Sequence, residues 1–209
     1  KLPDILESGY VLKVKDSTEN LLSLTISHNL QTTTAQGVYL FIHARNIVSV
    51  ATQYHLARNK TVVAISRDAL QDGISHITLF DSELNPVCER LYFLPVKNRL
   101  QVDIRSDQRE FGIRRKIAID INTRNTRSEP LAANVSVAVF KADSLQQRSE
   151  NNIHSYLWLD SDLSGSVESP EYYTQTDNPE VRHAIDLVML THGWRRFLWK
   201  DILTGPKPD

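Results

Sequence analysis

The chain reads SYLWLDSDLSGSVESPEYY at residues 155–173 and DLVMLTHGWRRFLW at residues 186–199, and these two runs decide how its fold is interpreted. They hold all three tryptophans of the 209-residue chain, its single methionine and the second half of its one convincing amphipathic helix. The sequence before them reads as short β-strands. A single helix appended to a β protein either carries a functional site or closes an open hydrophobic core.

The expected helix covers about residues 179–192. Asn178 suits the N-cap and Pro179 the first helical position, while Gly193 is a natural C-terminal stop. One stripe at helical spacing consists of Val181, Ile185, Val188, Met189 and His192. Such a stripe must be buried, so we expect it to pack on an edge or end of the second half of the chain. The seam would be covered by Trp194, Phe197 and Trp199.

Period-two alternation of apolar residues fills the rest of the chain and predicts strands with one buried face. It occurs at 10–14, 22–26 and 38–44, and again, after a hinge at 95–98, at 100–104, 117–121 and 135–139. Further strands are expected around 47–53, 61–66, 75–80 and 88–94. Polar turns separate these segments, and no strand–helix–strand rhythm is present. The pattern predicts a mainly β chain of two tandem antiparallel β-sandwiches, residues 1–97 and residues 98–209, the second with one C-terminal α-helix at about 179–192.

The charge and cysteine content exclude several functional classes. With 24 Lys and Arg against 25 Asp and Glu, the net charge of -1 gives no pull toward nucleic acid or an anionic membrane. No run approaches the roughly 20 apolar residues that cross a bilayer, so we expect no transmembrane segment. Cys88 is the only cysteine, which excludes an internal disulfide and favours a buried inert thiol. The start at Lys1 and the linker-like end suggest a piece of a longer protein.

Asp160 and Asp162 are the only candidate metal ligands. They open a run that resembles half of a calcium loop, because oxygen-bearing side chains alternate and a glycine, Gly165, stands at the sixth position. The flanking helices of an EF-hand are not predicted. Turn chemistry is therefore the favoured interpretation, and we expect no metal and no cofactor.

Two other features invite a functional interpretation. His192, with Asp186 or Asp162 as partner, could form an acid–base pair, but no nucleophile motif accompanies it, and a histidine at a helix end packs well without catalysis. The rings of Trp158, Tyr172 and Tyr173 could contact a carbohydrate or a peptide if they are exposed.

Residues 153–173, followed by 185–197, resemble a signature of large exported proteins of Bacteroidetes. In those proteins, macroglobulin-like β-sandwiches lie upstream of a plug domain similar to that of TonB-dependent receptors. Residues 72–81 and 88–93 also resemble segments of these proteins. The resemblance implies two macroglobulin-like or immunoglobulin-like sandwiches in the periplasm, in the outer membrane or at the cell surface. Its structural signature is carried here by Asp186, His192, Gly193 and Trp194, and it implies no catalytic residues.

The leading hypothesis is a non-enzymatic structural or interaction module of a larger exported, outer-membrane-associated protein. Its expected partners are other domains of the parent protein and outer-membrane transport components. The first alternative is a carbohydrate- or peptide-binding sandwich. The second is a hydrolase that uses His192.

Overall fold

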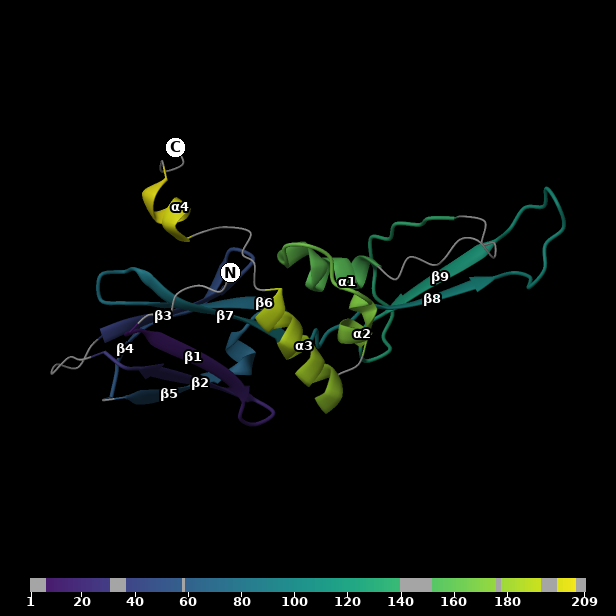
Figure 1. Cartoon of the computed structure of the whole chain (residues 1–209). Helices are drawn as coiled ribbons and strands as arrows, with labels where there is room; N and C mark the ends of the chain where they lie inside the picture. The colour runs from purple at the N-terminus through teal and green to yellow at the C-terminus, as the bar shows by residue number, and fades with distance from the viewer. Residues whose placement is uncertain are drawn as a thin grey trace. The chain divides into compact units, whose positions relative to one another are not determined.

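A computed structural model describes residues 7–30, 37–57, 59–139, 152–175, 178–192 and 199–205, and it is mainly β, as expected. Figure 1 shows its elements in chain order. The strands are β1 (Tyr10–Asp16), β2 (Leu21–His28), β3 (Gly37–Ala44), β4 (Ile47–His55), β5 (Lys60–Ser66), β6 (Gly73–Phe80), β7 (Pro86–Leu94), β8 (Gln101–Ser106) and β9 (Ile119–Arg124). Every strand pair described is antiparallel.

Two sheets share the main hydrophobic core. One has the order β1-β2-β5 and the other the order β4-β3-β6-β7 (Figure 1). Alternate residues of each strand point to the same side, so each sheet presents one apolar face. The fully or almost fully buried residues between the sheets include Leu22, Leu24, Ile26, Leu40, Ile42, Ile77 and Leu79. The residues of this set on β2 and β3 are ones that the period-two pattern assigned to buried faces.

The C-terminal segments cover one end of the outer face of the four-stranded sheet. They are α1 (Ile153–Trp158), the 3₁₀ turn η2 (Asp160–Asp162), α2 (Pro170–Gln175) and α3 (Pro179–Thr191). The last helix, α4 (Trp199–Thr204), is not part of this cover. A second buried cluster consists of Ile74, Leu91 and Phe93 from the sheet with Leu159, Leu163, Val167, Ile185, Val188 and Met189 from the C-terminal segments. β6 and β7 thus carry apolar side chains on both faces, one for each core.

The helix at 179–191 agrees with the expected one, including its start. The Asn178 side chain accepts a hydrogen bond from the backbone N–H of Val181 at 2.9 Å, and Pro179 opens the helix. The expectation of a single helix is wrong, because the described residues contain four α-helices. The other three have six residues each, which is under two turns and too short for a helical stripe to show in the sequence.

The expected position of the helix is also wrong. α3 packs on β7 and on the sheet residues Ile74, Leu91 and Phe93 of the second buried cluster, which belong to the first half of the chain. The helical stripe itself required burial, but it contained no information about which apolar face would receive it. Of the residues expected to cover a seam, Trp199 lies on the outer face of the same sheet, while Trp194 and Phe197 lie outside the described residues.

The chain divides into two compact units, residues 1–95 with 149–209, and residues 96–148. The domain assignment of 1–97 and 98–209 stays a prediction. The smaller unit contains the two-stranded sheet β8-β9, continued by one bridge between Arg124 and Pro130. The strand expected at 135–139 is not formed, and Val135, Val137 and Val139 are 51%, 60% and 82% exposed. With no apolar layer to bury them, pairing these valines into the sheet gains little.

Candidate functional site

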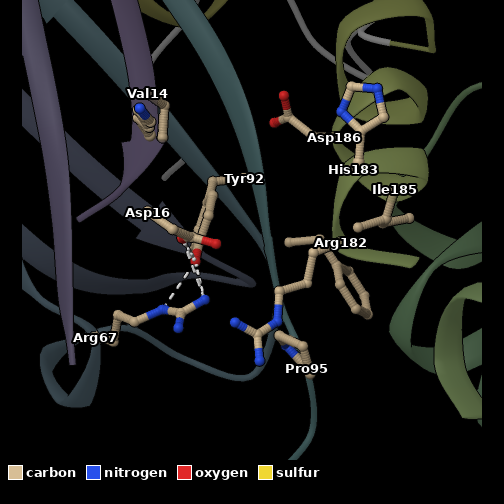
Figure 2. A pocket seen from close by; sticks show the side chains of 11 residues that line it. Val14, Asp16, Arg67, Tyr92, Pro95, Arg182, His183, Ile185 and Asp186 are labelled. Carbon is tan, nitrogen blue, oxygen red and sulfur yellow. Dashed lines mark hydrogen bonds and ion pairs between the residues drawn. The ribbon is translucent and has the colours of Figure 1, made fainter. Parts of the chain in front are cut away.

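A pocket of about 240 Å³ lies where α3 meets the two-sheet core, and we call it the α3 pocket (Figure 2). Its polar lining consists of Lys15 and Asp16 from β1, Arg67 from the 3₁₀ turn η1 (Arg67–Ala69), Tyr92 from β7, and Arg182, His183 and Asp186 from α3. Val14, Phe93, Pro95 and Ile185 form the apolar part. The pocket therefore combines a hydrophobic floor with side chains of both charges.

The wall opposite α3 is built around a buried arginine. The Arg67 side chain is 8% exposed, and its Nε and Nη2 donate to the Tyr92 hydroxyl at 3.0 and 2.6 Å. Its Nη1 donates to the Glu19 carbonyl at 3.0 Å, and Nη2 lies 3.3 Å from the Asp16 carboxylate. The Tyr92 hydroxyl in turn donates to Asp16 at 2.9 Å. A guanidinium this deeply buried requires such partners, and it fixes the geometry of this wall.

The Tyr92 phenol stays neutral at physiological pH. Burial raises its pKa far above the usual value, and the Asp16 carboxylate raises it further, while Arg67 opposes both effects. A neutral phenol of this kind is a hydrogen-bonding group rather than a general base. The lining also contains no serine, threonine or cysteine that could act as a nucleophile. The lining is therefore built from charged and hydrogen-bonding groups rather than around a hydroxyl or thiol nucleophile.

The α3 wall is fixed to β7 by an ion pair. Arg90, 9% exposed, places Nη2 2.6 Å from Oδ1 of Asp186, which is 42% exposed. Figure 2 shows the guanidinium groups of Arg67 and Arg182 facing one another across the pocket. Guanidinium groups recognise carboxylates and phosphates through paired N–H donors. An anionic group with a small apolar body is the ligand class that matches this lining.

The carboxylate oxygens of Asp160 are buried, and the Asp162 carboxylate is paired with an arginine. Asp162 accepts a hydrogen bond from Nε of Arg45 at 3.0 Å, and Arg45 also donates to the Leu157 carbonyl. Neither oxygen of the Asp160 carboxylate makes a hydrogen bond of good geometry to another described residue. Burial raises the pKa of this carboxyl, and the nearby backbone N–H of Val167 opposes part of the rise. In the described residues, no three His, Cys, Asp or Glu side chains gather as a metal site.

Arg45 reaches these aspartates because of a tight hairpin. Arg45 and Asn46 form the two-residue turn between β3 and β4, with φ of 47° and 68°. Positive φ at both positions is the backbone of a type I′ turn, which matches the twist of paired strands. From this tip the Arg45 guanidinium also lies 4.6 Å from the centroid of the Trp158 ring. The hairpin tip thus anchors α1 and η2 to the sheet.

The three candidate ligand-contact rings differ in exposure. Trp158 is half-buried beneath Arg45, and its ring lies where a Cβ on Gly73 would come within 3.1 Å. Tyr173 is partly buried against the second cluster, whereas Tyr172 is 49% exposed and meets Tyr173 edge to face at 5.2 Å. The three rings therefore do not form one exposed aromatic platform of the kind that binds sugars.

His192 occupies the C-cap of α3, and its backbone N–H donates to the Val188 carbonyl at 2.8 Å. The ring contact described for it is with the Thr191 hydroxyl at 3.4 Å. Its two suggested acidic partners are engaged elsewhere, Asp186 with Arg90 and Asp162 with Arg45. Gly193 and Trp194 lie outside the described residues. The role of His192 stays a prediction.

Cys88 is partly buried, and its Sγ donates to the Tyr10 carbonyl at 3.2 Å. Burial raises the pKa of the thiol, with a backbone hydrogen bond from Leu12 opposing the rise, so little thiolate forms near neutral pH. The expected inert thiol is consistent with this environment.

Sequence reasoning missed Arg67, Arg90 and Tyr92. One sequence signal was available for Arg90 and Tyr92, because Arg90 immediately precedes a run of four apolar residues, 91–94, that includes Tyr92. A strand end that is apolar at every position has both faces covered, and a charged residue beside it needs a partner from the covering element. Nothing in the sequence pattern around Arg67 marks it as buried.

The comparisons with known proteins leave the family open. No protein-family model matches the chain, and no curated protein matches it. None of the helices in the described ranges combines the length and apolar character that a membrane crossing requires.

Proposed function

We propose that the chain is a non-enzymatic interaction module of a larger exported, outer-membrane-associated protein. In this proposal the two-sheet core is an immunoglobulin-like or macroglobulin-like sandwich that acts as a scaffold. The observation that carries the proposal is the second buried cluster, in which segments some 60 residues beyond β7 return to cover β6 and β7. The scaffold is closed by its own chain, and residues 96–148 are an insertion between two anchored points.

The inserted unit supplies the interaction surface in this proposal. In the β8-β9 register, Ile104 lies opposite Ile121 and Val102 opposite Thr123, so the apolar residues of both strands share one face. Val102, Ile104 and Ile119 are 49%, 65% and 45% exposed. An isolated two-stranded sheet with an uncovered apolar face is only marginally stable in water. We propose that further β-strands of the parent protein cover this face.

Hydrogen–deuterium exchange in the parent protein tests this assignment. Amides of β8 and β9 should exchange markedly more slowly in the parent than in the isolated 209-residue chain, because pairing and burial protect them. An Ile104→Asp substitution should remove that extra protection. The control, Arg105→Asp, changes the neighbouring residue on the opposite face and should preserve it. Equal exchange of β8 and β9 in the parent and the isolated chain would overturn the proposed role of the insertion.

The α3 pocket favours one second candidate function, recognition of a peptide carboxylate. Arg67 is held by Tyr92, Asp16 and the Glu19 carbonyl, so Arg182 is the guanidinium that this proposal assigns to the ligand. The apolar lining residues would contact the body of a small ligand. Acetyl-leucine should perturb the NMR signals of pocket residues in the full chain, whereas acetyl-leucinamide, which lacks the charge, should not. Arg182→Gln should weaken the response to acetyl-leucine. Identical responses to the two probes would rule out carboxylate recognition.

A further inference from the structure

The outer face of the four-stranded sheet has a second end that α1, α2 and α3 do not cover. There Phe41 and His43 of β3 lie on the same face as His76, Thr78 and Phe80 of β6 and Glu89 of β7, because alternate residues share a face. The register places His43 opposite His76 and Thr78 opposite Glu89. This end therefore mixes aromatic rings with three ionisable side chains.

Trp199, the first residue of α4, sits on this end of the sheet. Its indole meets the rings of Phe80, Phe41 and His43 edge to face, with centroids 5.1, 5.8 and 5.9 Å apart. Its Nε1 donates to Glu89 Oε2 at 3.1 Å and to the Thr78 hydroxyl at 3.2 Å. An indole N–H that reaches a carboxylate inside an aromatic cage is a specific, directional contact.

The two histidines beneath it are stacked. The His43 and His76 rings are 5.1 Å apart and inclined by 12°. The Nδ1 atom of His76 lies 3.8 Å from Glu89 Oε1, and the side chains of His76 and Glu89 are 12% and 6% exposed. Two imidazolium ions stacked this closely with little water between them repel each other. Burial and the neighbouring His76 ring therefore disfavour the protonated form of His43 in the packed arrangement.

We propose that Trp199 and the His43–His76 pair form a proton-sensitive latch, which holds the 199–204 helix on the sheet at neutral pH and releases it in mildly acidic conditions. Protonation of His43 would place a poorly solvated charge next to the His76 ring and beneath the indole. That charge weakens the docked state.

The direction of the pH dependence follows from linkage. Burial lowers the pKa of His43 in the docked state, the neighbouring His76 lowers it further, and Glu89 opposes them. The docked state consequently binds fewer protons than the undocked state, in which His43 returns toward its ordinary value near 6.5. Docking is strongest above that value and is lost as the pH falls from it through the lower docked-state value. Among the described residues, His76 and Glu89 are the charged or titratable neighbours that shift the pKa of His43.

The indole N–H signal of Trp199 in the full 209-residue chain reports on the latch, and its absence from Trp199→Phe assigns it. Between pH 8 and pH 5 we expect the docked-to-undocked ratio to fall by on the order of threefold to tenfold, while the methyl signals of the two-sheet core stay in place. His43→Phe keeps an aromatic ring at this position without the proton site, and it should hold the latch closed at pH 5.

The matched control is His55→Gln, which changes an exposed histidine of β4 and should leave the transition where it is. A Trp199 signal that does not move with pH would overturn the proposal. So would a transition that His43→Phe leaves unchanged, or one in which the core methyl signals disappear together with the Trp199 signal, since that is acid unfolding of the whole unit.

Discussion

Replacement of the Met189 side chain by alanine tests whether the C-terminal helices and the two sheets form one folded unit. Met189 lies on α3, is 2% exposed and belongs to the second buried cluster with Phe93 and Leu159. Met189→Ala removes buried apolar atoms and leaves a cavity, which typically costs about 2–5 kcal/mol of the free energy of unfolding. The adjacent Leu190 is 56% exposed, so Leu190→Ala should change that free energy by less than about 0.5 kcal/mol.

The pair is matched because both substitutions create alanine on the same helix and shorten a side chain of similar size. Any gain in helix propensity, a few tenths of a kcal/mol at most, is shared by the two variants. With a urea dependence of about 2 kcal/mol/M, the buried substitution should lower the denaturation midpoint by roughly 1 M or more. Circular dichroism and tryptophan fluorescence should report a single coincident transition.

Two outcomes would refute this reasoning. If Met189→Ala and Leu190→Ala shift the midpoint equally, α3 does not pack by the stripe described. If a separate helix transition moves while the sheet transition stays in place, the helices cover the sheet without stabilising it, and the two-core scaffold is not one cooperative unit.

Three further substitutions test local features by urea denaturation. Gly73→Ala should destabilise the fold by about 1–2 kcal/mol, because φ is +87° there and an added Cβ would lie 3.1 Å from a carbon of the Trp158 indole. The control, Gly9→Ala, should be close to neutral, because no atom lies within 4 Å of the added Cβ. Tyr92→Phe should cost about 1–3 kcal/mol by leaving buried guanidinium donors short of an acceptor, and Tyr172→Phe, at a half-exposed ring, should cost almost nothing. Because the pKa of Asp160 is raised in the folded state, stability falls as the pH rises from the ordinary carboxyl pKa through the folded-state pKa. Asp160→Asn should therefore flatten this part of the stability–pH profile and raise stability at pH 7. An unchanged profile would contradict a raised pKa at Asp160.

Local pattern was sufficient to locate the strands of the larger unit and the start of α3. Period-two alternation depends only on which face of a strand is buried, and Leu22, Leu24 and Ile26 alternate in the sequence as they do in the core. The cap at Asn178 is equally local, because one side chain satisfies a backbone N–H three residues on. Such signals involve neighbours in sequence and need no knowledge of tertiary packing.

The candidate site was not predictable in the same way. The Arg67 network joins residues from β1, η1 and β7, and the latch joins β3, β6, β7 and α4. Each of these residues taken alone is an ordinary strand, turn or helix residue. Their juxtaposition depends on strand order, which a single sequence does not specify. The valines at 135–139 show the converse, since a strand pattern there is not sufficient to form a strand without a partner.

The apolar stripe on α3 must pack against an apolar surface, and the sequence of β7 indicates which surface that is. In a sheet covered on one side, apolar residues alternate with polar ones, as they do through β2. The end of β7 does not alternate: Leu91, Tyr92, Phe93 and Leu94 are all buried, with Leu91 and Phe93 facing the helices and Tyr92 and Leu94 facing the other sheet. A consecutive apolar run at a strand end therefore marks a second covering layer, and an amphipathic helix without an obvious partner is the element to assign to it.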